Sequence, residues 1–154
     1  MKQDKLEAPW NALKVLLVED DDGDAKAVAR AFRSAKVANP IVRARDGVEA
    51  LEYLRGSAAR ARMQPPFVIL VDVNMPRMDG HQFVSALRDD PDLHEHIAFM
   101  LTTSRDADDI SRAYGQNVAG YIVKEDAGHD FLRLAQTLDM YWTLVQKPLM
   151  EREE

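Results

Sequence analysis

The chain has 154 residues, a net charge of −6 and no cysteine, so it suits one domain with a buried core and excludes disulfide bonds and thiolate chemistry. No apolar run approaches the roughly 18–20 residues that span a membrane, and the N-terminus lacks the apolar segment of a signal peptide. Because no block of Lys and Arg is present either, we expect a cytoplasmic protein that contacts neither a membrane nor nucleic acid directly.

Short apolar segments alternate with helical patterns along the chain. The apolar segments, which predict buried strands, are 13–18, 41–44, 67–71, 97–101 and 119–123. The helical patterns cover 24–35, a segment from Asp46 to beyond Leu54, a segment from Asp79 to before Pro91, 106–115, and about 126–145. This alternation predicts an α/β fold, with a doubly wound parallel sheet of five strands and helices on both faces.

The same patterns predict the boundaries of the domain and of its helices. We expect an N-terminal extension over 1–12, one domain over 13–138, and an extended C-terminal helix and tail over 139–154. Asp46 with Glu49, and Asp79 with Gln82, have the spacing of a capping box, so both acids are predicted to begin helices.

Polar side chains follow four of the five predicted strands. Glu19 and Asp20 follow the first strand, Asp72 the third, Thr102 the fourth and Lys124 the fifth. The carboxyl ends of parallel strands meet at one edge of the sheet, where open α/β folds carry their chemistry. Acidic oxygens, a hydroxyl and an ammonium group in one place predict a Mg²⁺-assisted site that accepts a phosphoryl group.

Each of these signals alone has a simpler interpretation. The acidic segment 20–24 is also typical of a solvated loop with a helix cap, and Lys124 could be an ordinary surface lysine. Thr102 and Thr103 compete for one role, because alternating side chains allow only one of them to face the site. His94 and His96 are two residues apart, but no third ligand is evident, so we do not predict a zinc site.

Four motifs in this order resemble the receiver domain of response regulators in two-component signalling. They are Val18-Glu19-Asp20, the segment 71–80 (VDVNMPRMDG), Leu101-Thr102-Thr103-Ser104 and the segment 120–124 (GYIVK). The resemblance covers about residues 13 to 138. It implies a flavodoxin-like fold with strand order 2-1-3-4-5, which brings the ends of the first and third strands together at the switch point.

The resemblance implies a role for each acidic residue. Asp72 would be the phospho-acceptor and would take its phosphoryl group from the phosphohistidine of a sensor histidine kinase. Asp20, Asp72 and the main-chain carbonyl of Asn74 would bind Mg²⁺, with Glu19 acting mainly through water.

It also implies a phosphoryl-binding pair and a switch. Thr102 and Lys124 would hold the phosphoryl oxygens, and Tyr121 would be the aromatic residue that changes rotamer when Thr102 is drawn toward the phosphate. Most receivers have a proline after the lysine, whereas this chain has Glu125. We expect a trans Lys124–Glu125 bond, because a cis bond there would cost roughly 3–4 kcal/mol, and we expect an altered phosphoryl lifetime.

The last predicted helix carries an apolar series at three- and four-residue steps. Its members are Phe131, Leu134, Leu138, Tyr141, Trp142 and Val145. The series suits core packing, but it continues past the length that one sheet needs, so Leu138, Tyr141, Trp142 and Val145 are also candidates for a homodimer interface. The segment 138–145 resembles the tails of small regulators paired with phytochrome kinases, some of which dimerise through this end.

These observations favour a stand-alone response regulator, plausibly downstream of a bacteriophytochrome, that signals through protein contacts. It would not be a turnover enzyme, since only phosphotransfer to itself and autodephosphorylation are expected. One alternative is a receiver-like scaffold that works without phosphorylation. Another is a haloacid dehalogenase phosphatase, but those enzymes use a second aspartate as general acid where this chain has Asn74, and asparagine cannot do that work.

Overall fold

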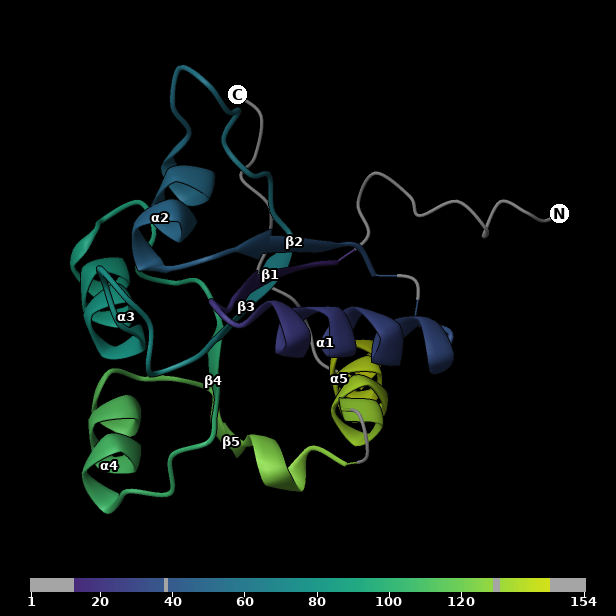
Figure 1. Ribbon diagram of the computed structural model, residues 1–154. Helices are drawn as coiled ribbons and strands as arrows, with labels where there is room; N and C mark the ends of the chain where they lie inside the picture. The colour runs from purple at the N-terminus through teal and green to yellow at the C-terminus, as the bar shows by residue number, and fades with distance from the viewer. Residues whose placement is uncertain (1–12, 38, 129–130, 145–154) are drawn as a thin grey trace, which may run out of the picture.

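The computed structural model describes residues 13–37, 39–128 and 131–144. Within them, one parallel sheet contains β1 (Lys14–Val18), β2 (Ile41–Ala44), β3 (Phe67–Val71), β4 (Ala98–Thr102) and β5 (Gly120–Val123). The strand order is β2-β1-β3-β4-β5 (Figure 1). The predicted doubly wound, flavodoxin-like topology is therefore confirmed.

Helices cover both faces of the sheet. They are α1 (Asp22–Ser34), α2 (Gly47–Arg55), α3 (Gly80–Asp89), α4 (Ala107–Gly115) and α5 (Leu132–Leu144). In Figure 1, α1 and α5 lie side by side on one face, and α2, α3 and α4 lie on the other. Four of these helices, α1 to α4, each follow the strand of the same number and begin near its carboxyl end.

The central strands are apolar on both sides because two cores flank them. Leu17 and Leu70 face the core beneath α1 and α5, whereas Leu16 and Ile69 face the core beneath α2, α3 and α4. Every residue of β3 is buried. A sheet covered on both faces requires such continuous apolar runs, which is why the strands were recognisable from the sequence.

Aspartates begin the helices at the carboxyl edge, as predicted, although in one case the reciprocal bond differs. Asp79 and Gln82 form the complete capping box of α3. Asp46 caps α2 by accepting the Glu49 N–H, but the Glu49 side chain accepts from the main chain of Arg45 rather than from that of Asp46. The cap of α1 is Asp21, so α1 begins at Asp22, two residues before the predicted start.

The last helix begins later than predicted. A single 3₁₀ turn spans Lys124–Asp126, and α5 starts only at Leu132. Gly128 lies between them at φ +92°, and a Cβ atom there would overlap the Arg133 side chain, so the chain turns at this point instead of continuing as a helix. The only cis peptide bond in the described ranges precedes Pro66, so Lys124–Glu125 is trans, as predicted.

Two predictions about the chain ends reach beyond the described residues. The extension over 1–12 lies outside them, and so does the tail over 145–154. In the part of the chain that the structure covers, the helices are too short and too polar for any of them to traverse a lipid bilayer.

Candidate functional site

Strand pairing brings the first two acidic residues together. The Asp72 N–H donates to the Val18 carbonyl at 3.0 Å, and the Glu19 N–H donates to the Ala44 carbonyl at 2.9 Å. Both residues therefore extend the ladder by one position beyond their strands. Both are also buried, Glu19 with 2% of its surface exposed and Asp72 with 8%.

Asp20 completes a cluster of three carboxylates. One carboxylate oxygen from each of Glu19, Asp20 and Asp72 lies within 4.8 Å of the others. Three hard, anionic oxygens in this space fit a divalent cation such as Mg²⁺ or Mn²⁺. The Asn74 N–H donates to Asp72 Oδ1 at 3.4 Å, whereas the role of its carbonyl as a metal ligand stays a prediction.

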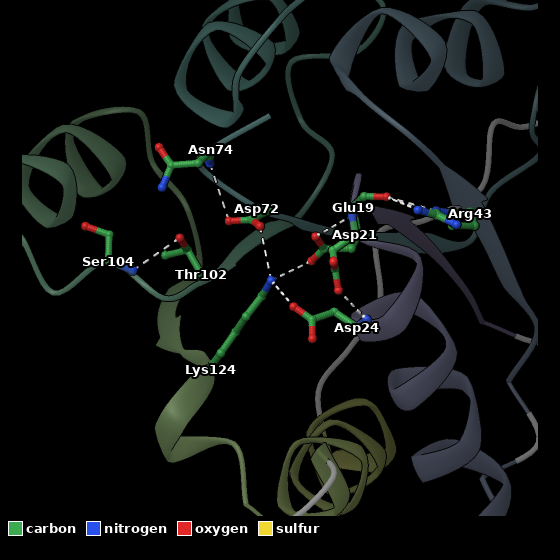
Figure 2. Close-up of polar contacts among 9 residues, drawn as sticks. All are labelled: Glu19, Asp21, Asp24, Arg43, Asp72, Asn74, Thr102, Ser104 and Lys124. Atoms are coloured by element: carbon green, nitrogen blue, oxygen red, sulfur yellow. Dashed lines mark hydrogen bonds and ion pairs between the residues drawn. The ribbon is translucent and has the colours of Figure 1, made fainter. Parts of the chain in front are cut away.

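Lys124 points into this acidic cluster, as Figure 2 shows. Its Nζ lies 2.8 Å from Glu19 Oε1, 2.7 Å from Asp24 Oδ2 and 3.1 Å from Asp72 Oδ2. Only 9% of the lysine side chain is exposed. The lysine is thus held by carboxylates from β1, β3 and the first turn of α1.

Burial and the neighbouring charges set the protonation states of Glu19 and Lys124. Burial raises the pKa of Glu19 to about 7, and the charge of Asp72 adds to the shift, while the hydrogen bond from Lys124 opposes it. Burial alone would lower the pKa of Lys124, but its hydrogen bonds to Asp24 and Glu19 raise it above the ordinary value. Lys124 is therefore a permanent cation, while Glu19 titrates near neutral pH.

Thr102 lies on the other side of Asp72. It ends β4, the neighbour of β3, and is completely buried, whereas Thr103 is exposed. The Thr102 Oγ1 accepts a hydrogen bond from the Ser104 N–H at 3.4 Å (Figure 2). Of the two threonines, Thr102 is the one enclosed beside the acidic cluster.

Tyr121 is connected to the loop that follows Thr102. Its hydroxyl donates to the Ser104 carbonyl at 3.0 Å. The Ser104 hydroxyl donates to Asp109 at 2.6 Å, and Asp109 also contacts Nε2 of the buried His81 at 3.1 Å. The hydrogen bond from Ser104 lowers the pKa of Asp109. This network links β5, the loop after β4, α4 and α3.

Two residues near the site were not anticipated as part of it. Asp24 contacts Lys124, and Arg43 donates from Nε and Nη2 to the Glu19 carbonyl at 2.8 and 2.7 Å. Arg43 also binds Asp22. An arginine inside the short, otherwise apolar strand β2 was the available signal for Arg43. For Asp24 the sequence pattern indicates only a solvated helix start.

Gly80 allows α3 to begin directly against the backbone of Asp72. Its N–H donates to the Val73 carbonyl at 2.8 Å. A Cβ atom at this position would overlap the main-chain carbonyl of Asp72 and approach Val73 Cα to 2.8 Å. Only glycine fits this close approach.

The candidate interface residues of α5 fall into different environments. Leu138 is 2% exposed and packs in the core, so the prediction that it faces a partner is wrong, because its side chain is needed to cover the sheet. Tyr141 is partly buried and packs edge-on against Phe99, with ring centroids 5.4 Å apart. The Trp142 side chain and Val145 lie outside the described part of the chain.

Comparisons with known proteins agree with this geometry. The sequence profile of the response regulator receiver domain matches residues 15–136. A probable methanogenesis regulatory protein, FilR2 of Methanothrix harundinacea, is 35% identical over 128 residues, which are 83% of this chain and 82% of that protein.

Solved structures of phytochrome response regulators are also similar. The phosphorylated cyanobacterial phytochrome response regulator RcpA has a TM-score of 0.79 and 31% identity, with 88% of this chain and 98% of that chain covered. The Mn²⁺-bound form of response regulator Rcp1, a protein of Synechocystis, has a TM-score of 0.76 and 28% identity, with 89% and 99% covered.

Proposed function

Since this chain belongs to the response regulator receiver domain family, we propose that it accepts a phosphoryl group on Asp72 from a sensor histidine kinase. The observation that carries this proposal is the convergence of Glu19, Asp20, Asp72 and Lys124 at the carboxyl edge of the sheet. The product would signal through protein contacts.

In the transfer, a carboxylate oxygen of Asp72 attacks the phosphorus of the kinase's phosphohistidine. A P–O bond forms as the P–N bond breaks, and the electron pair of that bond stays on the imidazole nitrogen. Phosphoryl transfer needs positioning and neutralisation of charge more than covalent assistance. The hydrogen bonds of Asp72 to Lys124 and to the Asn74 N–H hold the nucleophile in place.

The remaining residues of the site divide the work of handling negative charge. Glu19, Asp20 and Asp72 would hold Mg²⁺, together with the proposed Asn74 carbonyl, and the bound ion would neutralise charge on the phosphoryl oxygens. Lys124 would donate to one phosphoryl oxygen and the Thr102 hydroxyl to another.

The same contacts would start the conformational response. Drawing Thr102 toward the phosphoryl group shifts the loop that contains Ser104, which accepts the hydrogen bond of the Tyr121 hydroxyl. The Tyr121 side chain would then break this hydrogen bond and adopt another rotamer. The added charge of about −1.5 to −2 is large enough to bias such a two-state loop.

A first experiment tests the acceptor. The protein is incubated with acetyl phosphate and Mg²⁺, and intact mass and released phosphate are followed. We expect one labile phosphate per chain, and none in Asp72→Asn, which should stay folded. Labelling of Asp72→Asn would refute the assignment, absence of labelling in the wild type would favour a phosphorylation-independent scaffold, and release of many equivalents would favour a phosphatase.

A phytochrome-type kinase is the proposed donor. The similarity to RcpA and Rcp1 supports this assignment. Transfer of labelled phosphate from a purified bacteriophytochrome kinase should be faster than from an unrelated histidine kinase at equal concentration. Equal transfer from both would contradict the pairing.

A homodimer through the end of α5 is also proposed, with Tyr141, Trp142 and Val145 in the contact. An apolar groove of about 300 Å³ beside Tyr141, lined also by Phe99 and Ile122, is consistent with such a contact. Sedimentation at micromolar concentration, with and without phosphorylation, should detect the dimer, and a strict monomer in both states would exclude it.

A further inference from the structure

The ammonium group of Lys124 has no hydrogen left for a new partner. A lysine has three N–H donors, and Glu19, Asp24 and Asp72 are all within hydrogen-bond distance of Nζ. The contact with Asp24 is the shortest of the three, at 2.7 Å. A phosphoryl group on Asp72 can therefore bind Lys124 only if one of the present carboxylates gives up its hydrogen bond.

Asp24 is the partner that can be released at the lowest cost. Its side chain is 36% exposed, against 2% for Glu19 and 10% for Asp72, so on release it regains contact with water. Glu19 and Asp72 belong to the carboxylate cluster that suits a metal ion, whereas Asp24 does not. Exchange of Asp24 for a phosphoryl oxygen thus leaves the rest of the site intact.

The fold holds Asp24 in this competing position. Its main-chain N–H donates at 2.7 Å to Asp21, the cap of α1, so the first turn of the helix fixes where its carboxylate starts. Figure 2 shows Lys124 extended between Asp24 on one side and Asp72 on the other.

Resting on the proposed function, we propose that Asp24 is a positioning residue that holds Lys124 in the unphosphorylated arrangement and weakens the site's affinity for a phosphoryl group. Removal of its charge should free the lysine in advance. The gain in affinity should depend on loss of the contact between Asp24 and Lys124. Removal of a negative charge elsewhere near the site should not reproduce it.

Asp22 provides a matched control for that distinction. It lies in the same first turn of α1 and carries the same charge, but its carboxylate binds Arg43 and Arg45 instead of Lys124. Its side chain is 63% exposed. Asp22→Asn therefore removes one negative charge from the same helix end without freeing the lysine.

The test is calorimetric titration with beryllofluoride, an analogue of the phosphoryl group, in saturating Mg²⁺. We expect Asp24→Asn to bind it about tenfold more tightly than the wild type, the typical effect of one charge-assisted hydrogen bond, and Asp22→Asn to stay within about twofold. Asp24→Glu, which keeps a carboxylate, should return toward the wild-type affinity. The affinities of Asp24→Asn and Asp22→Asn for Mg²⁺ alone should differ by less than about twofold, because neither residue belongs to the cluster of three carboxylates.

The outcomes separate this inference from the proposed function. If the wild type binds no beryllofluoride and takes no phosphate from acetyl phosphate, the proposed function fails. If the wild type binds but Asp24→Asn gains no more than Asp22→Asn, or binds more weakly, the role of Asp24 is refuted and the phospho-acceptor assignment stands.

Discussion

Two cationic side chains lie at opposite ends of the strands of the sheet and have different kinds of hydrogen-bond partner. Lys124, at the carboxyl edge, is surrounded by the side chains of Glu19, Asp24 and Asp72. Arg88, near the amino ends of β4 and β5, donates to main-chain carbonyls of four residues, namely His94, His96, Gln116 and Asn117.

The difference lies in whether the partners can change. Carbonyl oxygens cannot take up a proton, bind a phosphoryl group or leave the backbone, so Arg88 fastens two loops permanently even though burial lowers its pKa. Carboxylates can be protonated, bound to a metal or modified, so the contacts of Lys124 depend on the state of the site. Arg88 therefore stabilises the fold under all conditions, whereas the stabilising contacts of Lys124 vary with the protonation, metal binding and modification of its partners.

The largest expected effect is on stability when Arg88 is replaced. Arg88→Met removes the donor from four main-chain hydrogen bonds, two of them partly buried, and should lower the free energy of unfolding by about 3 kcal/mol. Urea denaturation measures this. Arg30→Met, at an exposed position of α1, is the matched control and should stay within about 0.5 kcal/mol. Equal losses in both variants would contradict a fastening role for Arg88.

Lys124→Met should cost less, and its cost should depend on conditions. Without the ammonium the carboxylates repel one another, so we expect a loss of about 2 kcal/mol at pH 7. Addition of Mg²⁺, or a shift to pH 5 that protonates Glu19, should recover most of that loss. Neither treatment should rescue Arg88→Met in the same urea assay. A Lys124→Met deficit that is insensitive to both would break the contrast between the two cations.

Glu19 should leave its own signature in the pH dependence of stability. Its pKa is about 7 in the folded protein, against an ordinary value of 4.5. Between these values the folded state binds more protons than the unfolded state, so the contribution is fully present below pH 4.5 and is lost as the pH rises through 7.

Comparison with Glu19→Gln isolates this contribution. In metal-free buffer, the free energy of unfolding of the wild type minus that of Glu19→Gln should fall by as much as about 3 kcal/mol from pH 4.5 to 7.5, because each unit of pKa shift corresponds to about 1.4 kcal/mol. Urea denaturation at each pH provides the values. A difference that stays constant with pH would mean that folding does not shift the pKa of the Glu19 carboxyl.

The smallest expected effect concerns the residue after Lys124. Glu125 is exposed and pairs with Arg105 at 3.1 Å, so its charge adds little to stability. Glu125→Pro should alter the 3₁₀ turn that carries Lys124 and change the dephosphorylation rate by less than about tenfold, or 1.4 kcal/mol in barrier height. Phosphate release after removal of acetyl phosphate measures the rate. An unchanged rate would show that residue 125 does not influence how Lys124 is presented.

The sequence was sufficient for the strands and for the acidic cluster because both follow from local patterns. The run Phe67–Val71 must be a buried strand, and an acid directly after it must lie at the sheet edge. The start of α5 was missed, since a positive φ at Gly128 and the burial of Ala127 and Phe131 are decided by tertiary packing. Leu138 was misplaced for the same reason.

Two other long-range side-chain contacts of the site were beyond the sequence. Asp24 and Lys124 are a hundred residues apart, and only the folded geometry brings their charged ends to 2.7 Å. Arg43 reaches the Glu19 carbonyl from a neighbouring strand in the same way. The sequence indicates that a charged residue in such a position needs a partner, but it does not indicate which residue provides that partner.

The absence of a side chain at Gly80 brings the start of α3 into direct contact with the backbone of Asp72. The first residue of this helix packs against the peptide group of Asp72 and bonds to the Val73 carbonyl. A displacement of the start of α3 would therefore be transmitted directly to the backbone of Asp72, because no side chain lies between them.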